Sequence, residues 1–202
     1  MLRLLLVYFL FLGQIAKAEE VKHGIKLGVS TLHLNQVVTG QLVQALYLQA
    51  SGQSGNVYIY LDSPGGDFNA AKWFVAKFEH LRAKGKQIHC YAGNLVASAA
   101  FYIYLHCDQR YAIPTSKLFP HKIHILYREP VLPEELIATG IGTLQEQMAW
   151  DKKAAEITGM TPDDYLEFRD SDESLWSIKQ VLEKSHKQWF RLVDFYLVRV
   201  GL

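Results

Sequence analysis

The chain has 202 residues, of which half are hydrophobic and a fifth are charged, and its formal net charge is +1. This length allows one sizeable core with a small appendage rather than two full domains. The near-neutral charge gives no indication of a basic surface, so we expect no nucleic-acid partner. The composition is that of an ordinary globular domain.

The N-terminus has the pattern of a secretory signal peptide. Arg3 supplies a positive charge, residues 4–12 form an unbroken apolar run, and residues 16–18 (Ala-Lys-Ala) form a small-x-small cleavage site. The run is shorter than the roughly 20 apolar residues that span a bilayer. We therefore expect residues 1–18 to be removed and residues 19–202 to form a single domain that is exported, either periplasmic or secreted. An uncleaved N-terminal membrane anchor is the alternative.

The first part of the mature chain alternates between predicted strands and helices. Apolar residues at helical spacing predict the helices, and continuous β-branched and aromatic runs predict buried strands. In chain order we expect short strands at residues 26–29 and 30–34, a helix at 36–49, a strand at 57–61, a helix at 69–83, a strand at 87–91, a buried helix at 99–105 and a strand at 110–113. This alternation predicts an α/β fold with helices packed outside a parallel sheet.

The second part of the chain is less regular. Residues 125–139 contain two prolines and are expected to be irregular, whereas residues 142–157 have a helical pattern and are interpreted as a helical appendage. Pro162 is expected to open another short helix. Residues 185–202 are rich in aromatic and aliphatic side chains, which fits a core strand, a partner surface or a membrane-seeking tail.

Two cysteines occur, Cys90 and Cys107. In an oxidising compartment such a pair can form one disulfide, and two buried free thiols are the alternative. If a helix begins at Ser98, the chain folds back along the preceding strand and brings Cys107 towards Cys90.

Two features suggest chemistry, although neither is specific alone. The sequence Ser63-Pro64-Gly65-Gly66 follows a predicted strand, where glycines let backbone N–H groups face outward, but such a pair is usually only a turn. Ser98 stands at a predicted helix start, beside unpaired N–H groups that favour a developing negative charge. A serine in this position is more often a helix N-cap.

The order of these features resembles a known family. The segments that carry the resemblance are YIYLDSPGGDFNAAKWF, AGNLVASAAFYIYL and RYAIPTSKLFPHKI. They are similar to the Clp protease proteolytic subunit family of the crotonase-like superfamily, in which Pro114, Ser116 and His121 match a Pro-x-Ser-x₄-His motif. The match runs from about residue 28 to 124 and continues more weakly to Asp172. It implies a crotonase-like α/β fold of repeated ββα units with a helical appendage.

The resemblance also implies a site and an activity. The implied roles are Ser98 as nucleophile, His121 as general base, Asp172 as the acid that orients it, the amides of Gly66 and Ala99 as oxyanion hole, and Gly65 with Gly66 as binders of substrate backbone. The expected activity is that of a serine endopeptidase acting on peptides or unfolded proteins, with no cofactor and no metal. The expected partner is a sister subunit in a homo-oligomer, packed through the appendage. Membrane association through an uncleaved N-terminus or the C-terminal tail remains open.

Several departures from the family pattern leave other interpretations open. Gly93 stands five residues before Ser98, one more than is usual in the family, so the loop that carries the nucleophile is expected to be reshaped. Asp170 is an alternative acid. Lys117 or Lys122 would give a serine–lysine dyad, as in signal-peptide-peptidase relatives. A catalytically inactive binding or scaffold protein, or acyl-CoA chemistry of the crotonase type, would also use this fold.

A metal site is not expected. His121 and His124 lie three residues apart, and on a strand such residues face opposite sides, so their rings should not converge. No Walker-type ATP-binding loop occurs in the sequence, and ATP is not expected in an exported compartment, so nothing in the chain indicates an unfolding partner and the question of one stays open.

Overall fold

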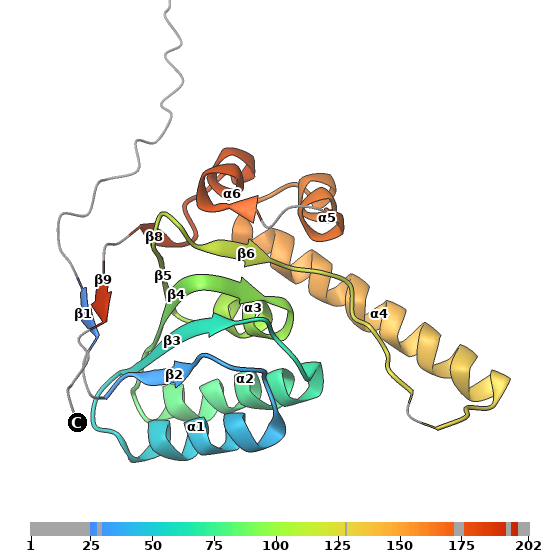
Figure 1. The fold of residues 1–202 in the computed structure, drawn as a ribbon, viewed down its shortest axis with the longest axis horizontal. Helices are drawn as coiled ribbons and strands as arrows, with labels where there is room; N and C mark the ends of the chain where they lie inside the picture. Colours follow the sequence, from blue (N-terminus) through green and yellow to red (C-terminus); the bar gives the residue numbers. More distant parts are fainter. Residues whose placement is uncertain (1–24, 28–29, 128, 172–175, 193–194, 198–202) are drawn as a thin grey trace, which may run out of the picture.

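The computed structural model describes residues 25–27, 30–127, 129–171, 176–192 and 195–197 (Figure 1). The predicted signal peptide and Asp172 lie outside these residues. The strands are β1 (Ile25–Leu27), β2 (Leu32–Leu34), β3 (Val57–Ser63), β4 (Ile88–Ala97), β5 (Gln109–Ala112), β6 (Lys117–Phe119), β7 (Trp176–Ser177), β8 (Arg191–Leu192) and β9 (Phe195–Leu197). The helices are α1 (Gly40–Gly52), α2 (Phe68–Ala83), α3 (Ser98–Leu105), α4 (Pro133–Thr158), α5 (Pro162–Asp170) and α6 (Ile178–Lys184).

The fold is built on a mostly parallel sheet, which confirms the predicted α/β class. Its strand order is β2-β3-β4-β5-β8, with all neighbours parallel, while β6 pairs in parallel with the end of β4 and antiparallel with β7. The strands β1 and β9 form a separate parallel pair. Helices α1 and α2 lie side by side against one face of the sheet (Figure 1). Apolar side chains between these layers, among them Phe74, Phe78 and Leu61, are fully buried.

The first two helices begin where side chains cap them. Thr39 accepts a hydrogen bond from the Leu42 N–H at 3.2 Å, and Asp67 accepts two from the first turn of α2. Helix α1 therefore begins at Gly40, four residues later than its apolar periodicity predicted. The physical reason is Val38, which leaves the helical pattern to form a parallel bridge with Gly66.

Strand β4 is longer than predicted because it continues through the small-residue stretch up to Ser98. Its pairing with β3 shifts register, since Leu61 faces Ala92 whereas Ser63 faces Val96. The intervening bulge is held by Asp62, which accepts the Leu95 N–H at 2.9 Å. In this bulge residues 93–95 stand opposite Asp62, in the stretch where the extra residue before Ser98 was noted, and β4 then pairs with β6 up to Ala97.

Cys90 and Cys107 form a disulfide with a Cα–Cα distance of 6.0 Å, inside the range that bridged cysteines adopt. Cys90 lies in β4 and Cys107 follows the end of α3, and both are buried. The bond therefore ties the strand that leads to Ser98 to the far end of the helix that Ser98 begins.

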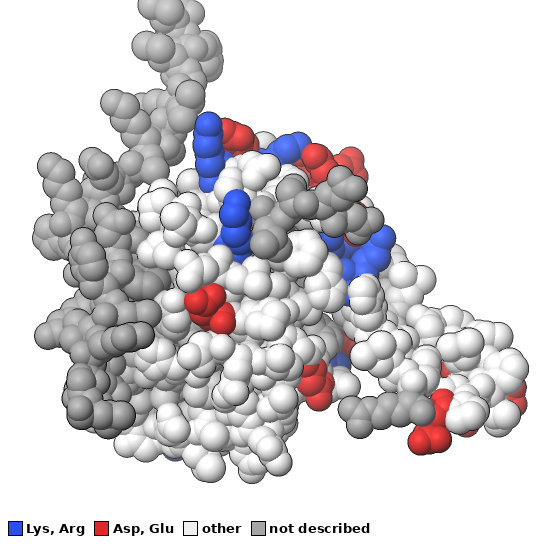
Figure 2. Space-filling view, in the orientation of Figure 1, with Lys and Arg blue, Asp and Glu red and all other residues white. Residues whose placement is uncertain are grey.

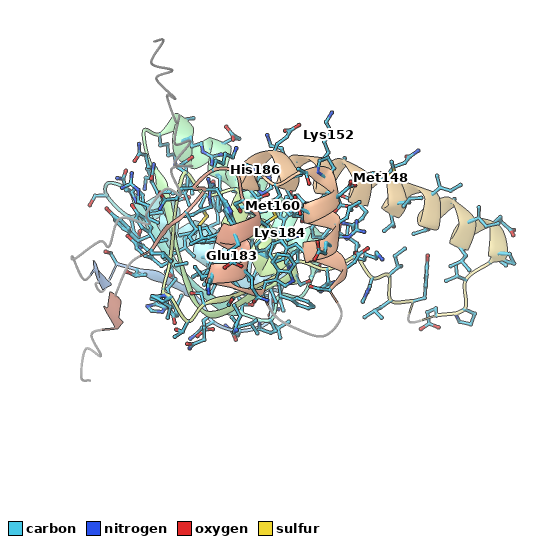
Figure 3. The ribbon with its side chains drawn as sticks, turned by 90° about the horizontal axis from the view of Figure 1, so that it is seen from above. Met148, Lys152, Met160, Glu183, Lys184 and His186 are labelled. Atoms are coloured by element: carbon cyan, nitrogen blue, oxygen red, sulfur yellow. A yellow bond between two sulfur atoms is a disulfide. The ribbon has the colours of Figure 1, made fainter. Side chains whose placement is uncertain are left out.

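Helix α4 corrects part of the expectation that residues 125–139 are irregular, because residues 133–139 are helical, whereas the described residues before them have no regular structure, as expected. It begins at Pro133, because proline is well tolerated in a first turn, and Glu134 and Glu135 sit favourably at its positive end. Only its C-terminal half packs on the body of the protein. Its N-terminal half extends as an arm, and the exposed Met148 and Lys152 lie in the half that is nearer the body (Figure 3). On the face shown in Figure 2 most of this arm is uncharged, with acidic groups at its tip.

The C-terminal region contains elements that the sequence did not predict. Helix α6 begins with a capping box between Ser177 and Gln180, which was overlooked. Within residues 185–202, β8 extends the main sheet beside β5, which favours the core-strand interpretation for that segment, while β9 pairs with β1 outside the main sheet. Among the described helices, none has the length and apolar character that crossing a bilayer requires.

Candidate active site

Ser98 is held in an unusual backbone conformation at the junction of β4 and α3. Its φ is 52°, and among the described residues it is the one non-glycine residue with positive φ. Such a conformation costs of order 1–3 kcal/mol and persists where the surrounding structure imposes it, often at functional sites. Ala97, rather than Ser98, is the N-cap of α3. The half-buried Ser98 hydroxyl is therefore not used as the cap that its position at a helix start suggested.

The two glycines after β3 allow the chain to approach Ser98 closely. Gly65 and Gly66 have φ of 93° and 146°, and a Cβ on Gly65 would come within 2.5 Å of the Ser98 Cβ. The turn is fixed by the buried Ser63, whose hydroxyl donates to the Gln36 carbonyl at 2.6 Å and accepts the Gly65 N–H at 3.1 Å. The backbone of this turn is thus packed directly against the candidate nucleophile.

Two backbone amides near Ser98, those of Gly66 and Ala99, are the candidates for an oxyanion hole. In the bridge with Val38, the Val38 N–H donates to the Gly65 carbonyl and the Asp67 N–H donates to the Val38 carbonyl, so the pairing does not use the Gly66 amide. The Ala99 amide is in the first turn of α3, where N–H groups have no partner within the helix. Gly66 and Ala99 both line the groove that contains Ser98.

His121 lies just beyond β6 and lines the same groove as Ser98. Strand β6 ends at Phe119, directly before Pro120, so His121 lies on the loop that follows. The Nδ1 atom of His121 lies 2.6 Å from the Lys122 carbonyl oxygen. Among the contacts of the described residues, no hydrogen bond joins His121 to the Ser98 hydroxyl.

The expectation that the rings of His121 and His124 do not converge was wrong. Their centroids are 5.1 Å apart. The cause is local backbone structure, because residues 120–127 follow no regular strand and the alternation of side-chain directions does not apply. Among the described residues, no cluster of three or more metal-ligating side chains includes this pair.

Ser116, the serine of the Pro-x-Ser-x₄-His motif, has a structural role. It is buried, and its hydroxyl donates to the Ala92 carbonyl at 3.0 Å while accepting the Ile113 N–H at 3.2 Å. These bonds fasten the turn between β5 and β6 to the middle of β4. Because β4 leads to Ser98 and β6 leads to His121, Ser116 helps to fix the separation of the two residues.

Of the two candidate acids, Asp170 lies within the described residues and Asp172 does not. Asp170 contacts Arg169 at 2.6 and 2.9 Å and Lys122 at 3.1 Å, and these partners, the Arg169 hydrogen bonds first, lower the pKa of its carboxyl. The carboxylate of Asp170 is therefore occupied by cations. Lys122, a candidate for a serine–lysine dyad, makes its ion pair with Asp170 and has no recorded contact with Ser98 among the described residues.

The groove around Ser98 has a volume of about 940 Å³. One wall is aromatic, since the Tyr102 ring lies 4.9 Å from Phe68 and 4.6 Å from Trp150. Lys72 and Glu146 form an ion pair that links α2 to α4 across this wall. The chain after His121, residues 122–126, also lines the groove. The groove is open and large enough for a stretch of extended peptide.

Sequence reasoning missed two residues of α4 that support the segment after His121. Gln147 and Asp151 are buried polar residues one helical turn apart, and Gln147 accepts a hydrogen bond from the Ile123 N–H at 2.7 Å. The available signal was the position of both residues on the same helical face as Trp150 and Ala154, where apolar side chains would be expected.

Comparisons with known proteins agree with this architecture. The family model described as Clp protease matches residues 25–177. The chain is 25% identical over 163 residues to the ATP-dependent Clp protease proteolytic subunit 2 of Pseudomonas aeruginosa, covering 80% of this chain and 78% of that protein. It is 29% identical over 151 residues to the protein of the same name from Treponema denticola, covering 71% and 70% respectively.

The fold is thus that of the crotonase-like superfamily, as the sequence motifs implied, and the matching family is one of peptidases. The chain belongs to the Clp protease family.

Proposed function

We propose that this protein is an exported serine peptidase that hydrolyses peptides or unfolded proteins, with Ser98 as nucleophile. The observation that carries the proposal is the strained backbone of Ser98, pressed against Gly65 at the edge of an open groove. A strained serine at a strand-to-helix junction presents its hydroxyl to substrate, as a nucleophile must. Family membership supports peptide hydrolysis as the reaction.

In this mechanism the Ser98 hydroxyl attacks the carbonyl carbon of a peptide bond and His121 takes its proton. The Nδ1 of His121 faces a carbonyl oxygen, which leaves Nε2 as the atom that accepts the proton. The tetrahedral oxyanion accepts hydrogen bonds from the Gly66 and Ala99 amides, each worth about 10²–10³ in rate by analogy with other such donors. His121 then protonates the leaving amine, and water releases the acyl group by the same steps.

Substrate binding draws the two residues together. General-base catalysis needs the Ser98 oxygen and the His121 nitrogen within about 2.6–3.2 Å in the working state, and resting structures are often looser. Asp172 is assigned as the acid that holds the imidazole, following the family motif. Asp170 is a weaker candidate because Arg169 and Lys122 already occupy its carboxylate.

The test is labelling by a fluorophosphonate, a reagent that reacts with activated serine hydroxyls. The wild-type protein should be labelled at Ser98, and Ser98→Ala should abolish the labelling. Ser54→Ala, at an exposed serine that does not line the groove, is the matched control and should be labelled like wild type. A wild-type protein that resists the probe and cleaves no peptide would leave the scaffold interpretation in place of the enzyme.

Self-association through α4 is part of the proposal. Four apolar residues form one stripe along the arm, at spacings of four, three and four: Ile137, Ile141, Leu144 and Met148. All four are more than half exposed. A sister subunit is the proposed occupant, because such an apolar face on a protruding helix matches another copy of itself under closed symmetry. Light scattering should give an oligomer, and Ile141→Glu with Leu144→Glu should yield smaller species. A wild-type monomer at micromolar concentration would contradict this.

Export is the remaining element. The charged start, the apolar run and the Ala-Lys-Ala site of residues 1–18 motivate it. The Cys90–Cys107 disulfide supports it, because disulfides persist in oxidising compartments. Intact-mass measurement of protein recovered from its native compartment should give a chain that begins at Glu19. Retention of residues 1–18 would instead indicate an uncleaved anchor, and recovery from the cytoplasm would contradict export.

A further inference from the structure

A chain of polar contacts runs from the buried face of α4 to the backbone next to His121. Its first link is the hydrogen bond from the Ile123 N–H to Gln147 Oε1 at 2.7 Å. The Gln147 amide nitrogen donates in turn to Asp151 Oδ1 at 2.8 Å. Both side chains are almost fully buried, so these bonds are formed in place of contacts with water.

The carboxylate of Asp151 decides which way the Gln147 amide faces. A carboxylate only accepts hydrogen bonds, so the NH₂ group of Gln147 must point to Asp151 and its oxygen must point to Ile123. Reversing the amide would place two acceptors together on one side and two donors on the other. Arg169 donates to the second oxygen of Asp151 and so holds the carboxylate in place.

A second set of contacts joins Arg169 to the same segment, at Lys122. Arg169 donates through two further nitrogens to Asp170, at 2.6 and 2.9 Å, and Asp170 pairs with Lys122 at 3.1 Å. Residues 122 and 123 are therefore fastened twice, once through the backbone and once through the lysine ammonium. This segment has no regular secondary structure, so these side chains take the place of strand pairing.

The peptide group between Lys122 and Ile123 links this network to His121. Its N–H donates to Gln147, and its C=O, on the other side of the same planar unit, lies 2.6 Å from Nδ1 of His121. Since a carbonyl oxygen only accepts, the contact requires a proton on Nδ1. Fixing the N–H towards α4 therefore fixes the carbonyl towards the imidazole.

We propose that the buried Asp151–Gln147 pair positions His121 through the Lys122–Ile123 peptide group, selecting the Nδ1–H tautomer that leaves Nε2 free to take the Ser98 proton. This rests on the proposed serine peptidase function. Gln147 is a positioning residue, because it acts through the peptide group and touches neither substrate nor the reacting atoms. His121 has one Nδ1–H, which the Lys122 carbonyl accepts in this resting arrangement, so Asp172 would share that proton or replace the carbonyl as its acceptor in the working state.

The test compares Gln147→Met with Gln145→Met. Methionine preserves length and helical propensity at position 147 but removes the acceptor for the Ile123 N–H, whereas Gln145 is exposed on the same helix and serves as the control. We expect Gln147→Met to slow fluorophosphonate labelling of Ser98 about tenfold to a hundredfold, part of the about 10²–10⁴ contributed by a positioned base. Gln145→Met should react like wild type.

A spectroscopic measurement separates positioning from general loss of structure. Nitrogen-15 NMR of histidine-labelled protein, in the solid state if the assembly is large, reports which ring nitrogen of neutral His121 carries the proton. Wild type should show Nδ1–H, and Gln147→Met should show a mixture of tautomers. A wild-type His121 protonated at Nε2 would overturn the proposal, and this holds even if the variant fails to fold.

The two proposals fail in different ways. If wild-type protein is not labelled at Ser98, the serine peptidase proposal fails. If wild type is labelled but Gln147→Met is labelled at the same rate with an unchanged His121 tautomer, the peptidase proposal stands and the positioning role of Gln147 is excluded.

Discussion

A Cβ atom on Gly65 would lie 2.5 Å from the Cβ of Ser98, closer than two such atoms approach in folded proteins. The contact joins the end of β3 to the start of α3 and leaves no room for a side chain between the turn and the candidate nucleophile. The glycine is needed for two reasons, this close approach and its φ of 93°.

We therefore predict that Gly65→Ala abolishes labelling of Ser98 and lowers stability by more than about 2 kcal/mol, because it adds overpacking to backbone strain. Gly55→Ala is the matched control, since Gly55 also has positive φ, 74°, but a Cβ there would meet no atom within 4 Å. The control should lose only about 1–2 kcal/mol and keep its reactivity. Chemical denaturation and probe labelling measure both effects, and equal behaviour of the two variants would contradict the prediction.

The disulfide is predicted to contribute about 3 kcal/mol to the free energy of unfolding, from the 17-residue separation of the two cysteines. The Cys90→Ala, Cys107→Ala double variant should show this loss in urea unfolding. Wild-type protein unfolded in the presence of a reductant provides the control, since it lacks the bond but keeps both sulfur atoms. Titration of two free thiols in the denatured, unreduced protein would show that the bond is not formed.

Asp170 should make stability depend on pH. Its hydrogen bonds with Arg169 and the nearby Lys122 lower its pKa in the folded state, so folding favours the ionised carboxylate. The contribution is fully present above the unfolded-state pKa of about 3.9 and is lost as the pH falls through the lower folded-state pKa. Asp170→Asn should thus be less stable than wild type at pH 7, and the difference in urea midpoint should shrink at pH 3. A difference that is independent of pH would contradict this assignment.

The sequence was sufficient for those parts of the site whose signal is local. The Ser-Pro-Gly-Gly turn was expected at the end of a strand and Ser98 at the start of a helix, and both lie there. The start of α1 and the extent of α4 did not follow. Val38 pairs with Gly66, 28 residues away, instead of joining the helix. The apolar face of the α4 arm packs against no other part of the described chain, so nothing in the sequence signalled the start of this helix.

The hydrogen bonds that join Asp151, Gln147 and the Ile123 N–H could not be predicted from local sequence patterns either. Gln147 and Ile123 are 24 residues apart, and nothing in either neighbourhood indicates that a glutamine side chain will bind a backbone N–H there. Only the packing of α4 against the loop after β6 brings them together. The same holds for His121 and His124, whose rings approach because the loop abandons the strand geometry on which the prediction depended.

The final prediction concerns Ser98 and His121 as a catalytic unit. Ser98→Ala and His121→Ala should each lower kcat for a fluorogenic peptide by about 10⁴-fold or more, and the double variant should be hardly worse than either. The reason is that the base serves only to activate the hydroxyl, so removing it from an enzyme without the hydroxyl costs nothing further.

Substitution of the assigned acid, Asp172, is a second test of the Ser98–His121 unit. Asp172→Asn should slow the reaction by up to about 10⁴-fold while leaving the unfolding midpoint close to wild type, because an acid in this position fixes the imidazole tautomer rather than the fold. Lys122→Met distinguishes the competing base. If Lys122→Met removes activity and His121→Ala retains it, the serine–lysine dyad replaces the histidine. If additive losses are measured for Ser98→Ala and His121→Ala, the two residues do not act in one step, and the groove would have to place some other base within reach of the hydroxyl.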